Sequence, residues 1–129
     1  MKYERYNEKT CNDGTYDHYR LTIYRHGLFE FSYKLHGRLG LKGGDFVEFL
    51  RNKKGQWYLC RSDAKHGFQL FTSCNKGGLS FKSKVLREQI KEDLFKWMDS
   101  TVQQNIDLLV DVYHPEQYEN QSIYKLLTK

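Results

Sequence analysis

Short runs of alternating apolar and polar residues, separated by glycine turns, occupy the chain from residue 19 to residue 81. In the run at 19–25 the apolar side chains fall on one face of an extended strand, and the run at 28–32 alternates again after the His26-Gly27 turn. A period of two is typical of strands with one buried face, and a tight turn between two such runs predicts a β-hairpin. Further strands are expected at 46–50, 56–61, 67–72 and 78–81.

Two other stretches have the period of helices. Residues 33–39 are predicted to form a short helix, because Ser32 can cap its start and Gly40 suits the left-handed conformation that ends a helix. Beyond Ser83 an apolar stripe recurs every three or four residues and breaks at 99–101, which predicts two helices or one kinked helix. The stripe consists of Leu86, Ile90, Leu94, Trp97, Met98, Val102, Ile106, Leu109, Val110 and Tyr113, and ends before His114-Pro115.

These periods predict an α+β protein, with a strand-rich N-terminal part that holds β-hairpins and a short helix, and a helical C-terminal part. A chain of 129 residues fits one soluble domain or two small lobes that share a core. We divide it into an N-terminal extension at 1–18, a β-hairpin unit at 19–62, a second hairpin with the helical region at 63–114, and a polar tail at 115–129.

Residues 27–35 are weakly similar to residues 78–86 when one residue is inserted. Both segments read as a glycine turn, a short strand, a capping serine and the start of a helix. A duplication within the chain would explain this similarity, and so would chance resemblance between two strand-to-helix junctions.

The composition indicates a reducing compartment and no membrane segment. No run of 18 apolar residues occurs, and the N-terminal residues 1–5 lack the apolar stretch of a signal peptide. Cys11, Cys60 and Cys74 are an odd number without C-x-x-C spacing, so neither a disulfide framework nor a zinc site is indicated. We therefore expect a cytoplasmic protein with no membrane contact and no cofactor.

Positive charge is concentrated in the middle of the chain. The formal net charge is +5, but residues 18–87 carry 14 Lys and Arg against four acids, so the remainder is net acidic. Clustered Lys and Arg attract phosphates whatever the base sequence, and this distribution favours a polyanionic partner. The alternative is the solvated, Lys-rich surface of an ordinary small protein.

The first hairpin unit resembles the AbrB-like swapped-hairpin regulators, which include transition-state repressors and addiction-module antitoxins. The resemblance covers about residues 19–61. It implies an intertwined dimer in which β-hairpins of two chains interleave, with a basic surface that binds duplex DNA. The residues that carry it are Gly27, Leu28-Phe29-Glu30-Phe31-Ser32, Leu39-Gly40-Leu41, Gly44-Asp45 and Val47-Glu48-Phe49, followed by a closing hairpin strand.

The candidate DNA-binding residues are basic side chains around the first hairpin and its helix, with their counterparts if the second unit repeats the first. Lysines in expected turns, at positions 53, 54 and 65, would only add phosphate contacts, which position a protein without reading sequence. The candidates are Arg20, Arg25, Lys34, Arg38, Lys42, Lys82, Lys84 and Arg87.

Aromatic residues are interleaved with these basic residues. Exposed rings would permit stacking on single-stranded nucleic acid, whereas buried rings would belong to the core. For Trp57 we favour the core. The aromatic residues concerned are Tyr24, Tyr33, Trp57 and Tyr58.

The sequence gives little indication of catalysis. No H-E-x-x-H, G-x-S-x-G or phosphate-loop pattern occurs, and the five histidines do not fall at metal-ligand spacing on one helix. Cys60 alternates within a strand, as a small buried residue does, and nothing orients a pair of Cys74 and His66 across their loop. We therefore expect no catalytic residue and no metal site.

Together these features predict a DNA-binding regulatory protein that acts as a dimer through a basic face of β-hairpins and short helix. A homodimer is expected because a two-hairpin unit of about 43 residues is too small to bury its apolar face alone. The alternative is a protein–protein interaction module without catalytic activity, of the antitoxin-like or phage-adaptor kind, whose C-terminal helical region engages another protein.

Overall fold

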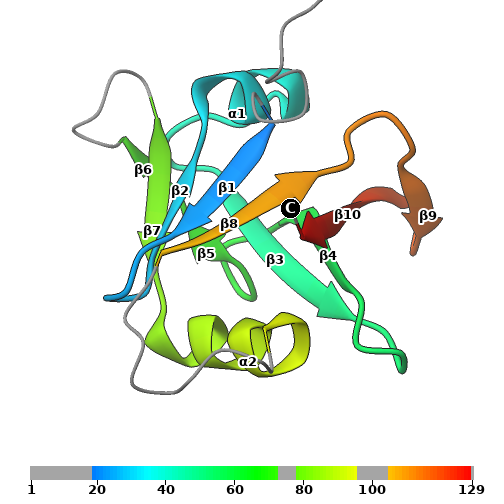
Figure 1. Cartoon of the computed structure of the whole chain (residues 1–129). Helices are drawn as coiled ribbons and strands as arrows, with labels where there is room; N and C mark the ends of the chain where they lie inside the picture. The colour runs from blue at the N-terminus through cyan, green and yellow to red at the C-terminus, as the bar shows by residue number, and fades with distance from the viewer. Residues whose placement is uncertain (1–18, 73–77, 96–104, 129) are drawn as a thin grey trace, which may run out of the picture.

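Antiparallel strands make up most of the protein (Figure 1). The computed structural model describes residues 19–72, 78–95 and 105–128, and 46% of these lie in strands against 19% in helices. The strands form one sheet that curls into a nearly closed barrel accompanied by two short helices. The expected α+β class with a helical C-terminal part is therefore wrong, and the fold is a small, mainly-β barrel.

The first half of the chain folds as its local patterns predict, into two antiparallel hairpins joined by a helix. The Ser32 side chain accepts the backbone N–H of Leu35 at 3.3 Å, and Gly40 ends the helix in the left-handed conformation at φ 69°. The elements are β1 (Arg20–Ile23), β2 (Leu28–Phe31), α1 (Tyr33–Leu39), β3 (Phe46–Arg51) and β4 (Trp57–Ser62).

The second half repeats this order if β5 and β6, which only Leu70 separates, are counted as one bent strand and β9 is counted as an addition. Ser83 caps its helix as Ser32 caps α1, accepting the backbone N–H of Leu86 at 3.1 Å. The elements are β5 (Phe68–Gln69), β6 (Phe71–Thr72), β7 (Leu79–Lys82), α2 (Lys84–Leu94), β8 (Ile106–Val110), β9 (Glu116–Tyr118) and β10 (Gln121–Thr128).

The sheet closes through the segment around Leu70. The strand order is β5-β3-β4-β10-β8-β1-β2-β7-β6, with β9 paired to β10 off this path. β5 and β6 stand at the two ends of the order, yet only Leu70 separates them in the chain. The Leu70 N–H donates to the Asp45 carbonyl at 2.8 Å, and its carbonyl accepts the Gly44 N–H at 2.7 Å. One bent segment therefore covers both edges of the sheet.

Strands of the first half of the chain pair with strands of the second half. β2 pairs with β7 and β4 with β10, while β1 pairs with β8 and β3 with β5. In this comparison β2 corresponds to β7, β3 to β8, β4 to β10, and β1 to the bent segment of β5 and β6. Exchanging each strand for its counterpart gives the same set of pairs, so the barrel has an approximate two-fold arrangement. The similar segments 27–35 and 78–86 are equivalent strand-to-helix junctions within it. Each half thus completes the sheet of the other within a single chain.

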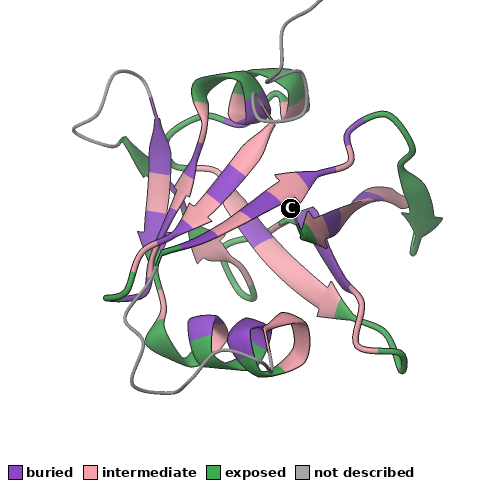
Figure 2. Ribbon diagram, in the orientation of Figure 1, coloured by how far each residue is buried: buried purple, intermediate pink, exposed green. Residues whose placement is uncertain are grey.

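The core fills the barrel, and the helices cover its two ends. α1 and α2 lie at opposite ends of the strands, and the buried part of α2 faces the strands (Figures 1 and 2). Leu35 of α1 and Ile90 of α2 are fully buried in the same cluster as Phe29 and Phe31 of β2. Burial at the side-chain period of each element joins both helices and the sheet into one core.

The region expected to hold the last helix instead contains strand β8. Ile106, Leu108 and Val110 are buried and alternate with half-buried neighbours, which is the period of a strand. The run Ile106-Asp107-Leu108-Leu109-Val110 fits either period in the sequence. Pairing with β1 on one side and β10 on the other satisfies its backbone groups and decides for a strand.

The segment taken as a polar tail also contributes to the sheet. β10 has eight residues and lies between β4 and β8, with Ile123 and Leu126 buried. Several expectations lie outside the described residues: the extension at 1–18, the break at 99–101, and the stripe residues Trp97, Met98 and Val102.

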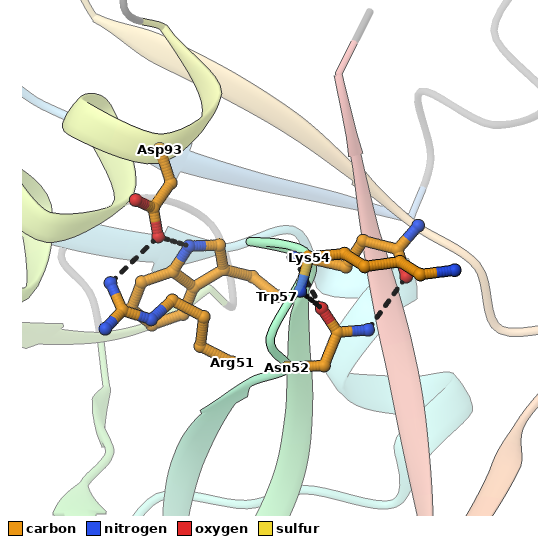
Figure 3. A network of polar contacts seen from close by, with 6 residues as sticks. Arg51, Asn52, Lys54, Trp57 and Asp93 are labelled. Carbon is orange, nitrogen blue, oxygen red and sulfur yellow. Dashed lines mark hydrogen bonds and ion pairs between the residues drawn. The ribbon is translucent and has the colours of Figure 1, made fainter.

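A polar network ties the β3–β4 hairpin to α2 (Figure 3). Trp57 of β4 is 6% exposed, and its indole N–H donates to Asp93 Oδ2 at 2.9 Å. Arg51 of β3 donates to the same oxygen at 3.1 Å, and its guanidinium carbon lies 5.7 Å from the centre of the Trp57 ring. The prediction that Trp57 belongs to the core is confirmed.

Candidate nucleic-acid interface

The structure divides the eight predicted basic residues into two groups at opposite ends of the barrel (Figure 1). The first group surrounds α1 and the start of β1, and the second surrounds the β1–β2 turn and the start of α2. Since the two helices lie at opposite ends, no single flat face brings all eight together. The first group is Arg20, Lys34, Arg38 and Lys42, and the second is Arg25, Lys82, Lys84 and Arg87.

An open groove of about 540 Å³ runs along α1 and the loop that follows it. Three predicted residues, Lys34, Arg38 and Lys42, contribute to its lining, and all three are exposed. Two tyrosines stand beside them, and among the residues that the structure describes no aspartate or glutamate lines the groove. The remaining lining residues are Tyr19, Tyr33, His36, Gly37, Gly40 and Leu41.

Local sequence explains why these basic side chains share one face. Leu35 points into the core, and Lys34 and Arg38 are four residues apart on the outer face of α1. The left-handed Gly40 then turns the chain, so that Lys42 follows directly after the helix. The Lys42 N–H donates to Asp45 Oδ2 at 2.8 Å, which fixes this turn.

A second, more polar depression of about 160 Å³ adjoins the groove. Arg20 lies in it, and Tyr33 lines both the depression and the groove. Tyr33 therefore stands between Arg20 on one side and the three basic residues of the α1 groove on the other. We call this continuous surface, formed by Arg20, Tyr33, Lys34, Arg38 and Lys42, the α1 track.

The carboxylates nearest the α1 track have partners of their own. Asp45 lies 3.5 Å from the Arg61 guanidinium, and Glu30 accepts the Tyr24 hydroxyl at 3.0 Å. Desolvation and this hydrogen bond to Glu30 raise the pKa of Tyr24, so the hydroxyl stays protonated and keeps donating. Glu30 lines the same depression as Arg20 and keeps its negative charge when it accepts the tyrosine hydroxyl. The positive field is therefore strongest over the α1 groove, where the described lining residues with a formal charge are basic.

Arg38 lies over the ring of Tyr113. Its guanidinium carbon lies 5.7 Å from the centre of the Tyr113 ring, a cation–π distance. Tyr19 meets Tyr113 edge to face, with ring centres 5.7 Å apart. The sequence did not single out Tyr19 or Tyr113 for the interface. Tyr113 was placed on the expected C-terminal helix, and the strand pairing that brings it to α1 has no local signal.

The second group of basic residues differs from the first. The Arg87 side chain is only 4% exposed and donates from Nη1 to Glu88 at 2.9 Å, so it is unsuited to an external phosphate. Arg25, Lys82 and Lys84 are exposed. The turn packs so closely on α2 that a Cβ on Gly27 would lie 2.9 Å from the Lys84 nitrogen.

Of the four predicted stacking aromatics, Tyr33 alone is exposed. Trp57 and Tyr58 are buried, and Tyr24 is half-buried with its hydroxyl bonded to Glu30. Tyr33 is 67% exposed at the first position of α1, where its ring meets His36 edge to face at 5.5 Å.

The described residues offer no reactive thiol, metal cluster or membrane-spanning helix. Burial raises the pKa of the Cys60 thiol to about 11, which makes it a poor nucleophile, and Cys74 lies outside the described residues. In the described parts of the chain, no three His, Cys, Asp or Glu residues gather as metal ligands. Neither described helix combines the length and apolar character needed to cross a bilayer.

Comparison with protein families, with curated proteins and with solved structures gives no match.

Proposed function

We propose that this protein is a DNA-binding regulatory protein that contacts the phosphate backbone through the α1 track. The observation that carries the proposal is the α1 groove, which has three exposed cations along one helix and the loop after it and no acid among its described lining residues. Phosphate contacts by Lys and Arg supply most of the affinity that does not depend on base sequence. The regulatory role is what the AbrB-like resemblance of residues 19–61 implies.

The structure removes the physical reason for expecting a homodimer. A homodimer was expected because the first hairpin unit could not bury its apolar face alone. The second half of the same chain covers that face, through the pairing of β2 with β7 and of β4 with β10. One chain therefore forms a complete α1 track without a partner copy. Light scattering at micromolar concentration measures the mass in solution and shows whether the protein is a monomer or a dimer.

The alternative of a protein-interaction module receives less support from the geometry. It relied on an apolar C-terminal stripe open to a partner. Ile90 and Ile106 of that stripe are buried in the barrel core, and Leu94 packs against it. We therefore favour DNA binding over a role as a protein-interaction module.

Fluorescence anisotropy with a labelled duplex of about 20 base pairs tests the proposal. If Arg20, Lys34, Arg38 and Lys42 each neutralise a phosphate, log affinity should fall with log salt at a slope of about −3.6, or about −0.9 per contact. Lys34→Ala with Arg38→Ala should weaken binding and flatten the slope by about 1.8.

The matched control removes the same charge elsewhere. Lys53 and Lys54 are exposed in the β3–β4 turn, away from α1 (Figure 1). Lys53→Ala with Lys54→Ala should leave the slope close to that of the parent. Absence of binding at low salt, or equal effects of the two double variants, contradicts the proposal.

A further inference from the structure

The position of Tyr33 on the α1 track points to a more specific ligand. We infer that the track binds single-stranded DNA in preference to duplex, with an unpaired base stacked on the Tyr33 ring. This inference rests on the proposed DNA binding and specifies the form of the DNA.

Tyr33 is exposed in a way that the fold does not require. It is the first residue of α1, and the core contact of the helix is made by Leu35, which is fully buried. An exposed fraction of 67% is the largest of any tyrosine named among the exposed apolar side chains of the described residues. A large ring left in water contributes little to folding, so its surface is free to bind another flat group.

His36 restricts the orientation of this ring. The two rings lie 5.5 Å apart at an interplanar angle of 81°, one turn of helix apart on α1. A side chain that is already held in one orientation loses less conformational entropy when a ligand binds. Tyr33 is therefore partly preorganised as a platform for a base.

Basic side chains flank the ring on both sides, and Tyr33 lines both hollows. Arg20 lies in the polar depression, which Glu30 also lines, and Lys34 and Arg38 lie in the groove. A strand that follows this surface places one phosphate near Arg20 and the next ones near α1, with a base between them over the ring. Basic grooves interleaved with aromatic rings are the common arrangement for binding single strands.

Base pairing determines whether the ring can be used. In a duplex the bases are stacked on each other inside the helix, so the protein meets phosphates and groove edges. An unpaired base can turn outward and lie on a ring. The α1 groove is open to solvent, so an unpaired base can approach the exposed Tyr33 ring without displacing protein groups.

Arg38 offers a second flat surface further along the same strand. Its guanidinium stands over Tyr113 at 5.7 Å, and Tyr113 is braced by the edge of Tyr19. A planar guanidinium can stack on a base on one side while it contacts a tyrosine on the other. Tyr33 and Arg38 thus provide two stacking positions within one helix.

The test uses the full chain and two labelled probes, an oligothymidylate of about 12 nucleotides and a duplex of equal length, at about 50 mM salt. The parent should bind the single strand more tightly. Tyr33→Ala should lower single-strand affinity by about 5- to 150-fold, the range for loss of one stacked base. Its duplex affinity should change by less than about twofold, and its single-strand salt slope should stay that of the parent, because no charge is removed.

Two further variants separate stacking from structure. Tyr33→Phe keeps the ring and should bind the single strand like the parent. Tyr118→Ala removes another half-exposed tyrosine, from β9, and should have no effect on binding. A 2-aminopurine base in the single strand should lose fluorescence with the parent and with Tyr33→Phe, and keep most of it with Tyr33→Ala.

The outcomes distinguish this inference from the proposed function. Salt-dependent duplex binding together with unchanged single-strand affinity of Tyr33→Ala overturns the inference and leaves the proposed function standing. Tighter binding of the duplex than of the single strand by the parent also overturns it. Binding of neither probe overturns both.

Discussion

Asp93→Ala should destabilise the protein by breaking the hydrogen bond between the buried Trp57 indole N–H and the Asp93 carboxylate. The Asp93 carboxylate is 18% exposed and also accepts Arg51 at 3.1 Å, whereas the Arg51 side chain is 49% exposed. Leaving a buried donor without an acceptor costs about 1–3 kcal/mol. The half-exposed ion pair adds about 0–1 kcal/mol. Removing a negative charge from the last turn of α2 offsets about 0.3–1 kcal/mol of this loss of stability, because it relieves an unfavourable interaction with the helix dipole.

The net expectation is a loss of about 2 kcal/mol in the free energy of unfolding, or roughly 8 °C in Tm at about 4 °C per kcal/mol for a chain of this size. Urea denaturation and thermal melting of the parent and three variants measure it. Asp93→Asn keeps an acceptor oxygen for the indole and should lose less than half as much. Arg51→Ala removes the ion pair and leaves the indole bond, so it should cost about 1 kcal/mol or less. Equal stability of Asp93→Ala and the parent would refute the reasoning, as would a larger loss in Arg51→Ala.

Two other predictions follow from burial. Ile90→Ala, at a fully buried position, should cost about 2–5 kcal/mol in urea denaturation. Leu94→Ala, at a half-buried position, should cost less than Ile90→Ala, and a larger cost at Leu94 contradicts the assignment of the core. The Cys60 pKa, raised from 9.0 to about 11, means that the folded state holds the thiol proton more tightly than the unfolded state does. Stability should therefore be complete below about pH 9 and fall as the pH rises toward 11, less steeply in Cys60→Ala. Peptide mapping after iodoacetamide treatment at pH 8.5 should show Cys60 unmodified until urea is added, and rapid modification of the folded protein would be inconsistent with its burial.

Local sequence determined the elements whose signals are complete within a few residues. The hairpin turn at Gly27, the serine caps at Ser32 and Ser83, and the left-handed stop at Gly40 are chosen by backbone geometry and neighbouring hydrogen bonds. The helical spacing of Lys34 and Arg38 likewise placed both on the outer face of α1. These interactions form between residues close in sequence, so the pattern of residue types is enough to predict them.

Tertiary structure alone decided which strands pair and what the C-terminal quarter becomes. The run at 106–110 is compatible with a helix or a strand, and it becomes β8 because β1 and β10 offer it backbone partners from distant parts of the chain. The same pairing brings Tyr113 under Arg38, and packing against the barrel buries Arg87 although its sequence position suggested a surface contact. Each of these outcomes depends on contacts between residues far apart in the chain. The free energy of such contacts is decided by the whole sheet, and no local pattern of residues encodes it.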